Sequence, residues 1–166
     1  MNKKLIAILF LMAPLAIFAQ KFGHLNSADI MQVMPEYKAA QTEIQNLEKQ
    51  YTNELQMMES ELSKKSEAYE KEKATLPANI AQRREAELQE LYTRMQQYYQ
   101  QSQQELAQAS QEKMAALTEK ISKAIKEVGS AGGYLYIFDV ASGIPYISET
   151  LSTDVTAAVK AKLGIK

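Results

Sequence analysis

The stretch that decides the fold runs from Glu36 to Val128, opening with EYKAAQTEIQNLEKQ (36–50) and closing with AALTEKISKAIKEV (115–128). It contains no glycine, and its only proline is Pro77. Because proline interrupts a helix, the stretch predicts two long helices that meet at this residue. Two such helices joined by a short turn bury their apolar residues by folding back on each other. The stretch therefore predicts a long antiparallel helical hairpin with its tip near Pro77.

Apolar residues recur along both predicted helices with the spacing of one helical face. If the chain folds back at the tip, residues whose numbers sum to about 154 face each other, which pairs Leu47 with Leu106. Because the second helix is longer than the first, residues 119–128 have no partner in the hairpin and are expected to pack into its base. The helical arm is therefore predicted over residues 35–118.

The segment before the hairpin predicts the first part of a small base. Phe22 to Asn26 predicts a short strand, and Ser27 is an expected N-cap for a brief helix. Pro35 is expected at the first position of the first long helix, where proline is favoured. Gly129 is the predicted end of the second long helix.

The segment after the hairpin predicts the rest of the base. Residues 134–140 and 144–148 are rich in aromatic and β-branched side chains and predict a β-hairpin. Ser152 or Thr153 is expected to cap a final helix. The predicted fold class is therefore α+β and mainly α, in which a long helical hairpin projects from a small β-sheet body.

The predicted body, residues 20–34 and 119–166, is too small to cover its own sheet. Strand 134–140 is apolar on both faces, and one copy of the chain cannot cover both faces and protect the strand edges. Homo-oligomerisation through the body is therefore expected. The residues predicted to form this oligomeric body are Phe22, Leu25, Tyr134, Tyr136, Ile137, Phe138, Val140 and Tyr146.

Residues 1–19 have the pattern of an export signal. Lys3 and Lys4 give a basic start, residues 5–18 are apolar, and Ala19 ends a cleavage-like sequence. The apolar run of about 14 residues is short for a membrane-spanning helix, which needs about 20. A cleaved signal peptide and a periplasmic mature chain are expected, with an uncleaved inner-membrane anchor as the alternative. The sequence has no cysteine, so neither a disulfide nor a lipid-attachment site is expected.

The composition offers no basis for catalysis, for a cofactor or for a metal. His24 is the only histidine, and it is expected to be a structural or surface residue. The carboxylates are spread along the solvated faces of the long helices, and no glycine-rich phosphate loop precedes a helix. After removal of residues 1–19, the chain has 17 basic and 20 acidic residues and a formal charge of −3. An enzyme is therefore not expected, and neither is a nucleic-acid partner.

Soft and amphipathic side chains lie beside the apolar stripe of the arm. Met57 neighbours Met58, Tyr92 follows Leu91, and Tyr99 follows Tyr98, so these pairs cannot all face the other helix. Methionine and tyrosine suit contacts with varied sequences, because one is flexible and polarizable and the other amphipathic. The alternative is that they only thicken the seam of the hairpin. The candidate binding residues on the arm are Met57, Met58, Tyr69, Tyr92, Met95 and Tyr99.

The order of these elements resembles the Skp/OmpH family of periplasmic chaperones. The resemblance spans the mature chain: the strand at Phe22, the hairpin begun by Pro35, the strand at Tyr134, and a closing segment from Tyr146 through Ser152-Thr153-Asp154-Val155-Thr156 to Val159. It implies a homotrimer whose helical arms project from a shared body. The arms would enclose a cavity that holds unfolded outer-membrane proteins without ATP, with the arm residues above as candidate client contacts.

The charge of the tip departs from that family. Well-known members have basic arms, whereas residues 64–90 of this chain carry six basic and six acidic side chains. Contact with membrane or lipopolysaccharide is therefore doubtful, and client binding is expected to depend only weakly on salt. A different class of function stays open, in which the hairpin is a structural spacer of the cell envelope and binds no unfolded chain.

Overall fold

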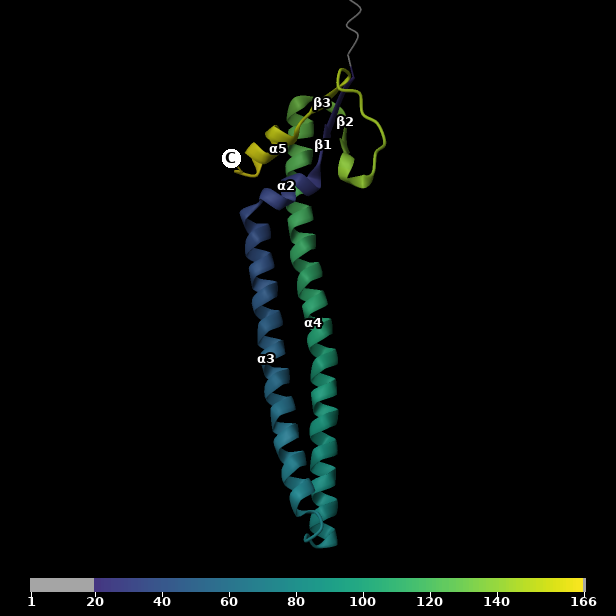
Figure 1. Cartoon of the computed structure of the whole chain (residues 1–166). Helices are drawn as coiled ribbons and strands as arrows, with labels where there is room; N and C mark the ends of the chain where they lie inside the picture. The colour runs from purple at the N-terminus through teal and green to yellow at the C-terminus, as the bar shows by residue number, and fades with distance from the viewer. Residues whose placement is uncertain (1–19, 166) are drawn as a thin grey trace, which may run out of the picture.

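The structure, a computed structural model, describes residues 20–165 and has the shape of a long arm on a small body (Figure 1). The arm consists of two antiparallel helices, α3 (Pro35–Glu72) and α4 (Ala78–Gly132). The body contains the strands β1 (Lys21–Leu25), β2 (Tyr134–Asp139) and β3 (Ser152–Asp154) and the short helices α2 (Ser27–Val33) and α5 (Thr156–Lys162). The predicted fold class is confirmed. The predicted signal peptide lies outside the described residues.

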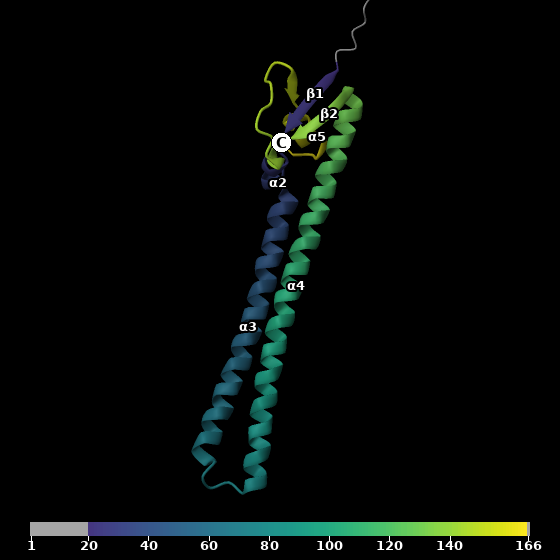
Figure 2. The same cartoon turned by 90° about the vertical axis from the view of Figure 1, so that its right-hand side faces the viewer.

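Both helices of the arm begin at a proline, as the sequence predicts, but neither ends at the predicted residue. The first helix, α3, ends at Glu72 instead of next to Pro77, because residues 73–76 belong to the turn. Pro35 is the first residue of α3, and Pro77 is the N-cap of α4, after the turn that forms the tip (Figure 2). The prediction that α4 ends at Gly129 is wrong: the helix continues to Gly132, and Gly133 ends it with φ +66°. A Cβ at Gly129 would lie 3.3 Å from Cδ1 of Ile137, so this glycine lets α4 approach β2 closely.

The two helices of the arm pair in the predicted register. Near the tip the Tyr69 hydroxyl donates to Glu85, and the two residue numbers sum to 154. Near the body Lys120 pairs with Glu36, and these two numbers sum to 156. The seam side chains between them are mostly half-buried, since only one helix covers each of them. Beyond Lys120, α4 packs against the body, with Ile121 and Ala124 buried there.

The three strands form one parallel sheet in the order β2-β1-β3. The predicted β-hairpin is therefore wrong, because residues 144–148 form no strand and β2 pairs with β1 instead of with the segment that follows it. The chain leaves β2 through a short 3₁₀ helix (η1, Val140–Ser142), which the Asp139 side chain caps by accepting a hydrogen bond from the Ala141 N–H. Gly143 then takes φ +83°, and the chain continues as a loop that leads to β3.

The hydrophobic core lies where the sheet, α2, α5 and the last turns of α4 meet. Leu25, Ile30, Met34, Val155 and Val159 are its fully buried members. Their side chains come from both ends of the sequence, so the body closes only when the segments before and after the arm pack together.

The caps of the two short helices differ from the predicted ones. Asn26, not Ser27, caps α2, and its side chain accepts hydrogen bonds from two N–H groups of the first turn. Ser27 is engaged elsewhere, because its N–H and hydroxyl both donate to the carboxylate of Asp139. Ser152 and Thr153 lie in β3, and the Asp154 side chain accepts from the Thr156 N–H at the start of α5 (2.8 Å).

Candidate functional site

The described part of the chain, residues 20–165, holds neither a membrane-spanning helix nor a ready-made metal site. No helix in it is long and apolar enough to cross a bilayer. No group of three or more histidine or acidic side chains in it is arranged to hold a metal ion. The candidate sites are therefore surfaces: one face of the sheet, and the flanks of the arm.

The outer face of the sheet carries a cluster of aromatic rings, most of which are exposed. Phe22 of β1 stacks with Tyr136 of β2 at 6.4 Å, and Tyr136 stacks with Phe138 at 6.0 Å. The long loop after η1 adds Tyr146 and Leu151, which are both 78% exposed. We call these five residues the body face. A hollow of about 370 Å³ lies between its strands and this loop.

The body face exists because side chains alternate along a strand. Leu25 and Ile137 point to the core side, whereas Phe22 and Phe138 point away from it. One protomer covers the core side with helices and leaves the other side bare. A monomer would thus expose a continuous apolar surface, which soluble monomers rarely do.

The residues predicted to form an oligomeric body fall into two groups. Four of them, Phe22, Tyr136, Phe138 and Tyr146, lie on the body face. The others serve the protomer itself: Leu25 is buried in its core, Tyr134 and Ile137 pack against that core, and Val140 is a half-buried residue of η1. Leu151 is not among the residues predicted from the sequence, although a lone leucine between Thr150 and Ser152 is a detectable signal.

His24 lies on the strand that carries Phe22. Its Nδ1 is 2.8 Å from Oγ of Ser152 on the neighbouring strand β3. Asp154, its cross-strand neighbour, has a pKa below the usual range, chiefly because of its hydrogen bonds with Thr156 and to a smaller extent because of the charge of His24. The Ser152 hydroxyl meets Nδ1 of the imidazole, and the Asp154 carboxylate accepts a hydrogen bond from the Thr156 N–H, so these side chains tie β1 to β3 and to the start of α5.

Asp139 connects the end of β2 to the start of α2. Burial raises the pKa of its carboxyl group, but the hydrogen bonds from the Ser27 hydroxyl, the Ser27 N–H and the Ala141 N–H outweigh burial and hold the pKa below its usual range. The carboxylate therefore ties together two segments that are 112 residues apart in the sequence.

The candidate binding residues of the arm do not form one surface. Met58, Tyr69 and Met95 are half-buried in the seam between α3 and α4. Met57 is 59% exposed and lies among α3 residues only, on the side of that helix that faces away from α4. Tyr99 is 53% exposed and borders a groove that both helices line, and Tyr92 lies two turns before it.

The groove beside Tyr99 combines apolar and amide side chains. Leu55 and Met95 contribute the apolar lining, Glu59 the only charge, and Gln96 and Gln100 the amides. We call it the mid-arm groove, formed by these five residues and Tyr99. Gln96 also donates to the Tyr92 hydroxyl at 2.6 Å, so Tyr92 extends the same face of α4 toward the tip. The glutamines of the mid-arm groove are not predicted from the sequence, because polar residues on a helix surface carry no periodic signal.

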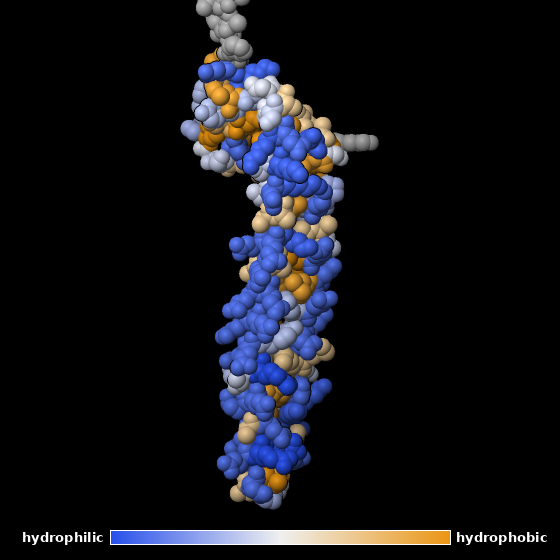
Figure 3. Space-filling model, turned by 180° about the vertical axis from the view of Figure 1, so that it is seen from behind, coloured by the Kyte–Doolittle hydropathy of each residue, from blue (hydrophilic) through white to orange (hydrophobic). Residues whose placement is uncertain are grey.

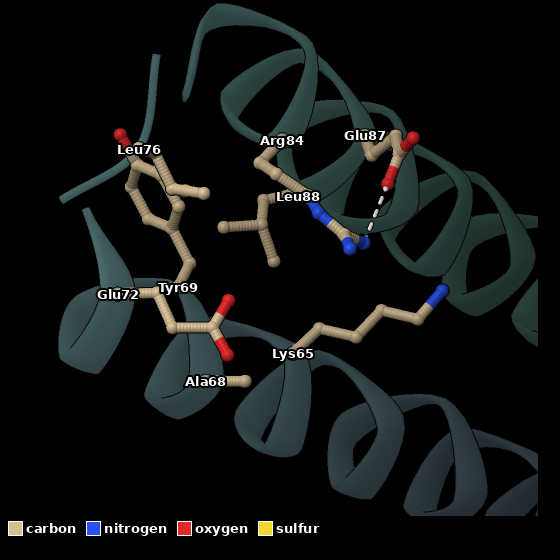
Figure 4. A pocket seen from close by; sticks show the side chains of 8 residues that line it. All are labelled: Lys65, Ala68, Tyr69, Glu72, Leu76, Arg84, Glu87 and Leu88. Carbon is tan, nitrogen blue, oxygen red and sulfur yellow. Dashed lines mark hydrogen bonds and ion pairs between the residues drawn. The ribbon is translucent and has the colours of Figure 1, made fainter. Parts of the chain in front are cut away.

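The tip of the arm is held by polar contacts between its own residues. Tyr69 and Leu88 point into the space between the helices (Figure 4). The Tyr69 hydroxyl donates a hydrogen bond to Glu85 of α4. This hydrogen bond raises the pKa of Tyr69. Arg84 lies 3.4 Å from Glu87, and Lys65, Lys73 and Arg83 also have acidic partners. The geometry thus leaves no unbalanced positive patch among these residues.

A second tyrosine joins the helices in the middle of the arm. The Tyr51 hydroxyl donates to Glu105, and this hydrogen bond raises the pKa of Tyr51 to about 12. The same contact holds the pKa of Glu105 below its usual range. The Tyr51 ring also meets the Tyr98 ring edge-on at 6.1 Å.

The surface of the molecule differs between its two parts. Figure 3 shows that hydrophobic residues gather over the body, whereas on the arm they form a narrow, interrupted line between hydrophilic side chains. The apolar surface is thus concentrated on the body, and smaller apolar contacts are spread along the arm.

Comparison with known proteins identifies the family of the chain. No curated protein matches it in sequence. A crystal structure of a Caulobacter crescentus protein, described as an OmpH-like outer membrane chaperone, has a similar fold with a TM-score of 0.76 and 19% sequence identity, over 87% of this chain and 83% of that one. The family model for OmpH-like outer membrane proteins matches residues 21–163, so the chain belongs to the OmpH-like family.

Proposed function

We propose that the chain is a periplasmic chaperone that binds unfolded outer-membrane proteins without ATP and prevents their aggregation. The observation that carries the proposal is the pairing of a long two-helix arm with a bare apolar body face on one small protomer. The arm offers many weak contacts instead of one tight site, which suits clients of varied sequence. Membership of the OmpH-like family supports the same conclusion.

The body face serves as the contact between protomers in this proposal. Three copies that bury Tyr136, Phe138, Tyr146 and Leu151 against each other would form a homotrimer, with the arms pointing the same way around a shared cavity. The exposed edges of β2 and β3 favour the same arrangement, because unpaired strand edges are prone to pair with another chain. The mass of the mature protein in light scattering tests this step, and a stable folded monomer would contradict it.

The chaperone activity is tested by dilution of a urea-denatured β-barrel protein into buffer. Equimolar trimer is expected to suppress the light scattering of the aggregating barrel in the absence of ATP. Serum albumin at the same mass concentration is the control for nonspecific crowding. If the oligomeric protein leaves the scattering unchanged, it is no holdase.

A structural spacer is the second candidate function. The observation that favours it is the mostly hydrophilic arm surface in Figure 3, which needs no client to stay soluble. A spacer would assemble through the same body face but would leave the aggregation of the barrel unchanged. The two functions therefore differ in the scattering experiment and agree in the mass measurement.

A further inference from the structure

The middle of α4 contains ten consecutive residues without a charge, Met95–Gln104, with the sequence MQQYYQQSQQ. Six of the ten are glutamines. The tip differs sharply, since residues 64–90 carry twelve charged side chains. Polar residues keep an exposed helix soluble whether or not they are charged, so solubility alone does not explain the absence of charge in this segment.

The uncharged segment has two sides. Tyr98 and Ser102 face α3: the ring of Tyr98 meets Tyr51, and Ser102 is buried. Gln96, Tyr99 and Gln100 face outward and line the mid-arm groove. The groove is therefore an exposed surface whose floor is apolar and whose rim consists mainly of amides and a phenol.

This chemistry fits a polypeptide main chain better than a charged ligand. A glutamine amide both donates and accepts hydrogen bonds, as a peptide group does. The only charge in the groove, on Glu59, is negative, so phosphates, nucleic acids and anionic lipids find no cation there. The α4 part of the groove, from Met95 to Gln100, spans about 9 Å, the length of two to three residues of an extended chain at about 3.3 Å each.

We propose that the mid-arm groove binds extended, uncharged segments of an unfolded polypeptide. An apolar side chain of the segment packs against Leu55, Met95 and Tyr99, while its main-chain N–H and C=O groups pair with Gln96 and Gln100. The proposal rests on the proposed function, and it assigns the client contact to one flank of the arm. Met57, on the far side of α3, has no part in it.

Tyr99 and Met57 provide a matched pair of substitutions. Both side chains are more than half exposed and neither lies in the seam, so Tyr99→Ser and Met57→Ser are expected to leave the helical content unchanged in circular dichroism. In fluorescence anisotropy with a labelled, denatured β-barrel protein, Tyr99→Ser combined with Gln100→Ala is expected to weaken binding about tenfold. Met57→Ser combined with Gln56→Ala is the control and is expected to bind as the wild type does.

Site-specific photo-crosslinking tests where the client binds, and it replaces only one residue of the groove at a time. A photo-reactive amino acid at Gln100 is expected to capture the client, and the same amino acid at Gln56 is not. Equal capture at both positions, or no difference between the paired variants, would overturn the inference while the holdase function stands. Crosslinks from position 100 to a second copy of the chain would also overturn it and would assign the groove to protomer contact. If the wild-type protein fails to bind the barrel at all, the proposed function itself falls.

Discussion

The body and the arm bury their apolar residues to very different degrees. In the body, elements from several directions surround Ile30, Met34 and Val159, and these side chains are fully buried. In the arm, a seam residue has one neighbouring helix and stays half-exposed, apart from a few positions such as Leu91. Because the free energy of burial scales with the area removed from water, the same substitution costs more in the body than in the arm.

The difference in burial also corresponds to a difference in role between the body and the arm. The body gains its stability from a closed core and exposes its remaining apolar surface in one place, the body face. The arm spreads small contacts over its whole length, so that local opening at one turn leaves the other turns intact. A stable assembly platform and an adaptable binding surface are thus combined in one chain.

The largest expected effect comes from a cavity in the body core. Ile121→Ala removes a buried side chain at the junction of α4 with the body, and we expect the free energy of unfolding to fall by about 2 to 5 kcal/mol. Ile44→Ala in the half-buried seam is the matched control, with an expected loss of about 1 kcal/mol. Urea titration followed by circular dichroism measures both. Equal losses would show that the arm is as tightly packed as the body.

The next effect concerns assembly. Tyr136→Ser with Phe138→Ser replaces two exposed rings of the body face, so the protomer should stay folded while the oligomer dissociates. Loss of two aromatic contacts of about 2 kcal/mol each would weaken association by about three orders of magnitude. Light scattering measures the mass, and Val33→Ser, an exposed apolar residue of α2, is the control. An unchanged mass would show that the copies meet elsewhere.

A smaller effect is expected at the carboxylate that joins the two ends of the body. Asp139 has a lowered pKa in the folded protein, so its contribution is complete above the ordinary pKa of about 3.9 and is lost as the pH falls through the lower folded value. Asp139→Asn should cost about 1 kcal/mol at pH 7, because the site is partly exposed. Urea titrations at pH 7 and pH 3 should show a difference between variant and wild type that shrinks in acid; a constant difference would contradict the charge-based explanation.

The smallest effect is expected for the ion pairs across the arm. Lys113 pairs with Glu43 while both side chains are about half-exposed. Lys113→Ala should change the free energy of unfolding by about 0.5 kcal/mol or less, and added salt should remove the difference. Thermal unfolding at low and high salt provides the measurement. A loss above 1 kcal/mol would mean that polar contacts, and not the apolar seam, hold the arm together.

The arm could be predicted from the sequence in detail because helices are local structures. The spacing of apolar residues fixed the seam, and Pro77 fixed the turn and therefore the register. The same periodicity indicated that some of the paired methionine and tyrosine side chains stay outside the seam, and Met57, Tyr92 and Tyr99 are exposed. The grouping of Tyr99 with Leu55 into one groove could not be predicted from the periodicity, because it depends on how the two helices are rotated toward each other.

The body could be predicted only in outline because its contacts join distant segments. Residues 144–148 have the composition of a strand, yet they form none, and β2 pairs with β1 from the other end of the chain. Ser27 has the properties of an N-cap, yet Asp139 engages it from 112 residues away. In both places a local preference was overridden by a partner that sequence neighbours do not reveal.

The sequence by itself thus determined the helical hairpin, its register, its neutral tip and its exposed methionine and tyrosines, because these depend on residues a few positions apart. Only the tertiary structure decided the parallel order β2-β1-β3, the body face that this order leaves bare, and the flank of the arm on which the mid-arm groove lies. Those features arise from pairing between segments more than 100 residues apart and from the relative rotation of two helices, neither of which is encoded in a local pattern.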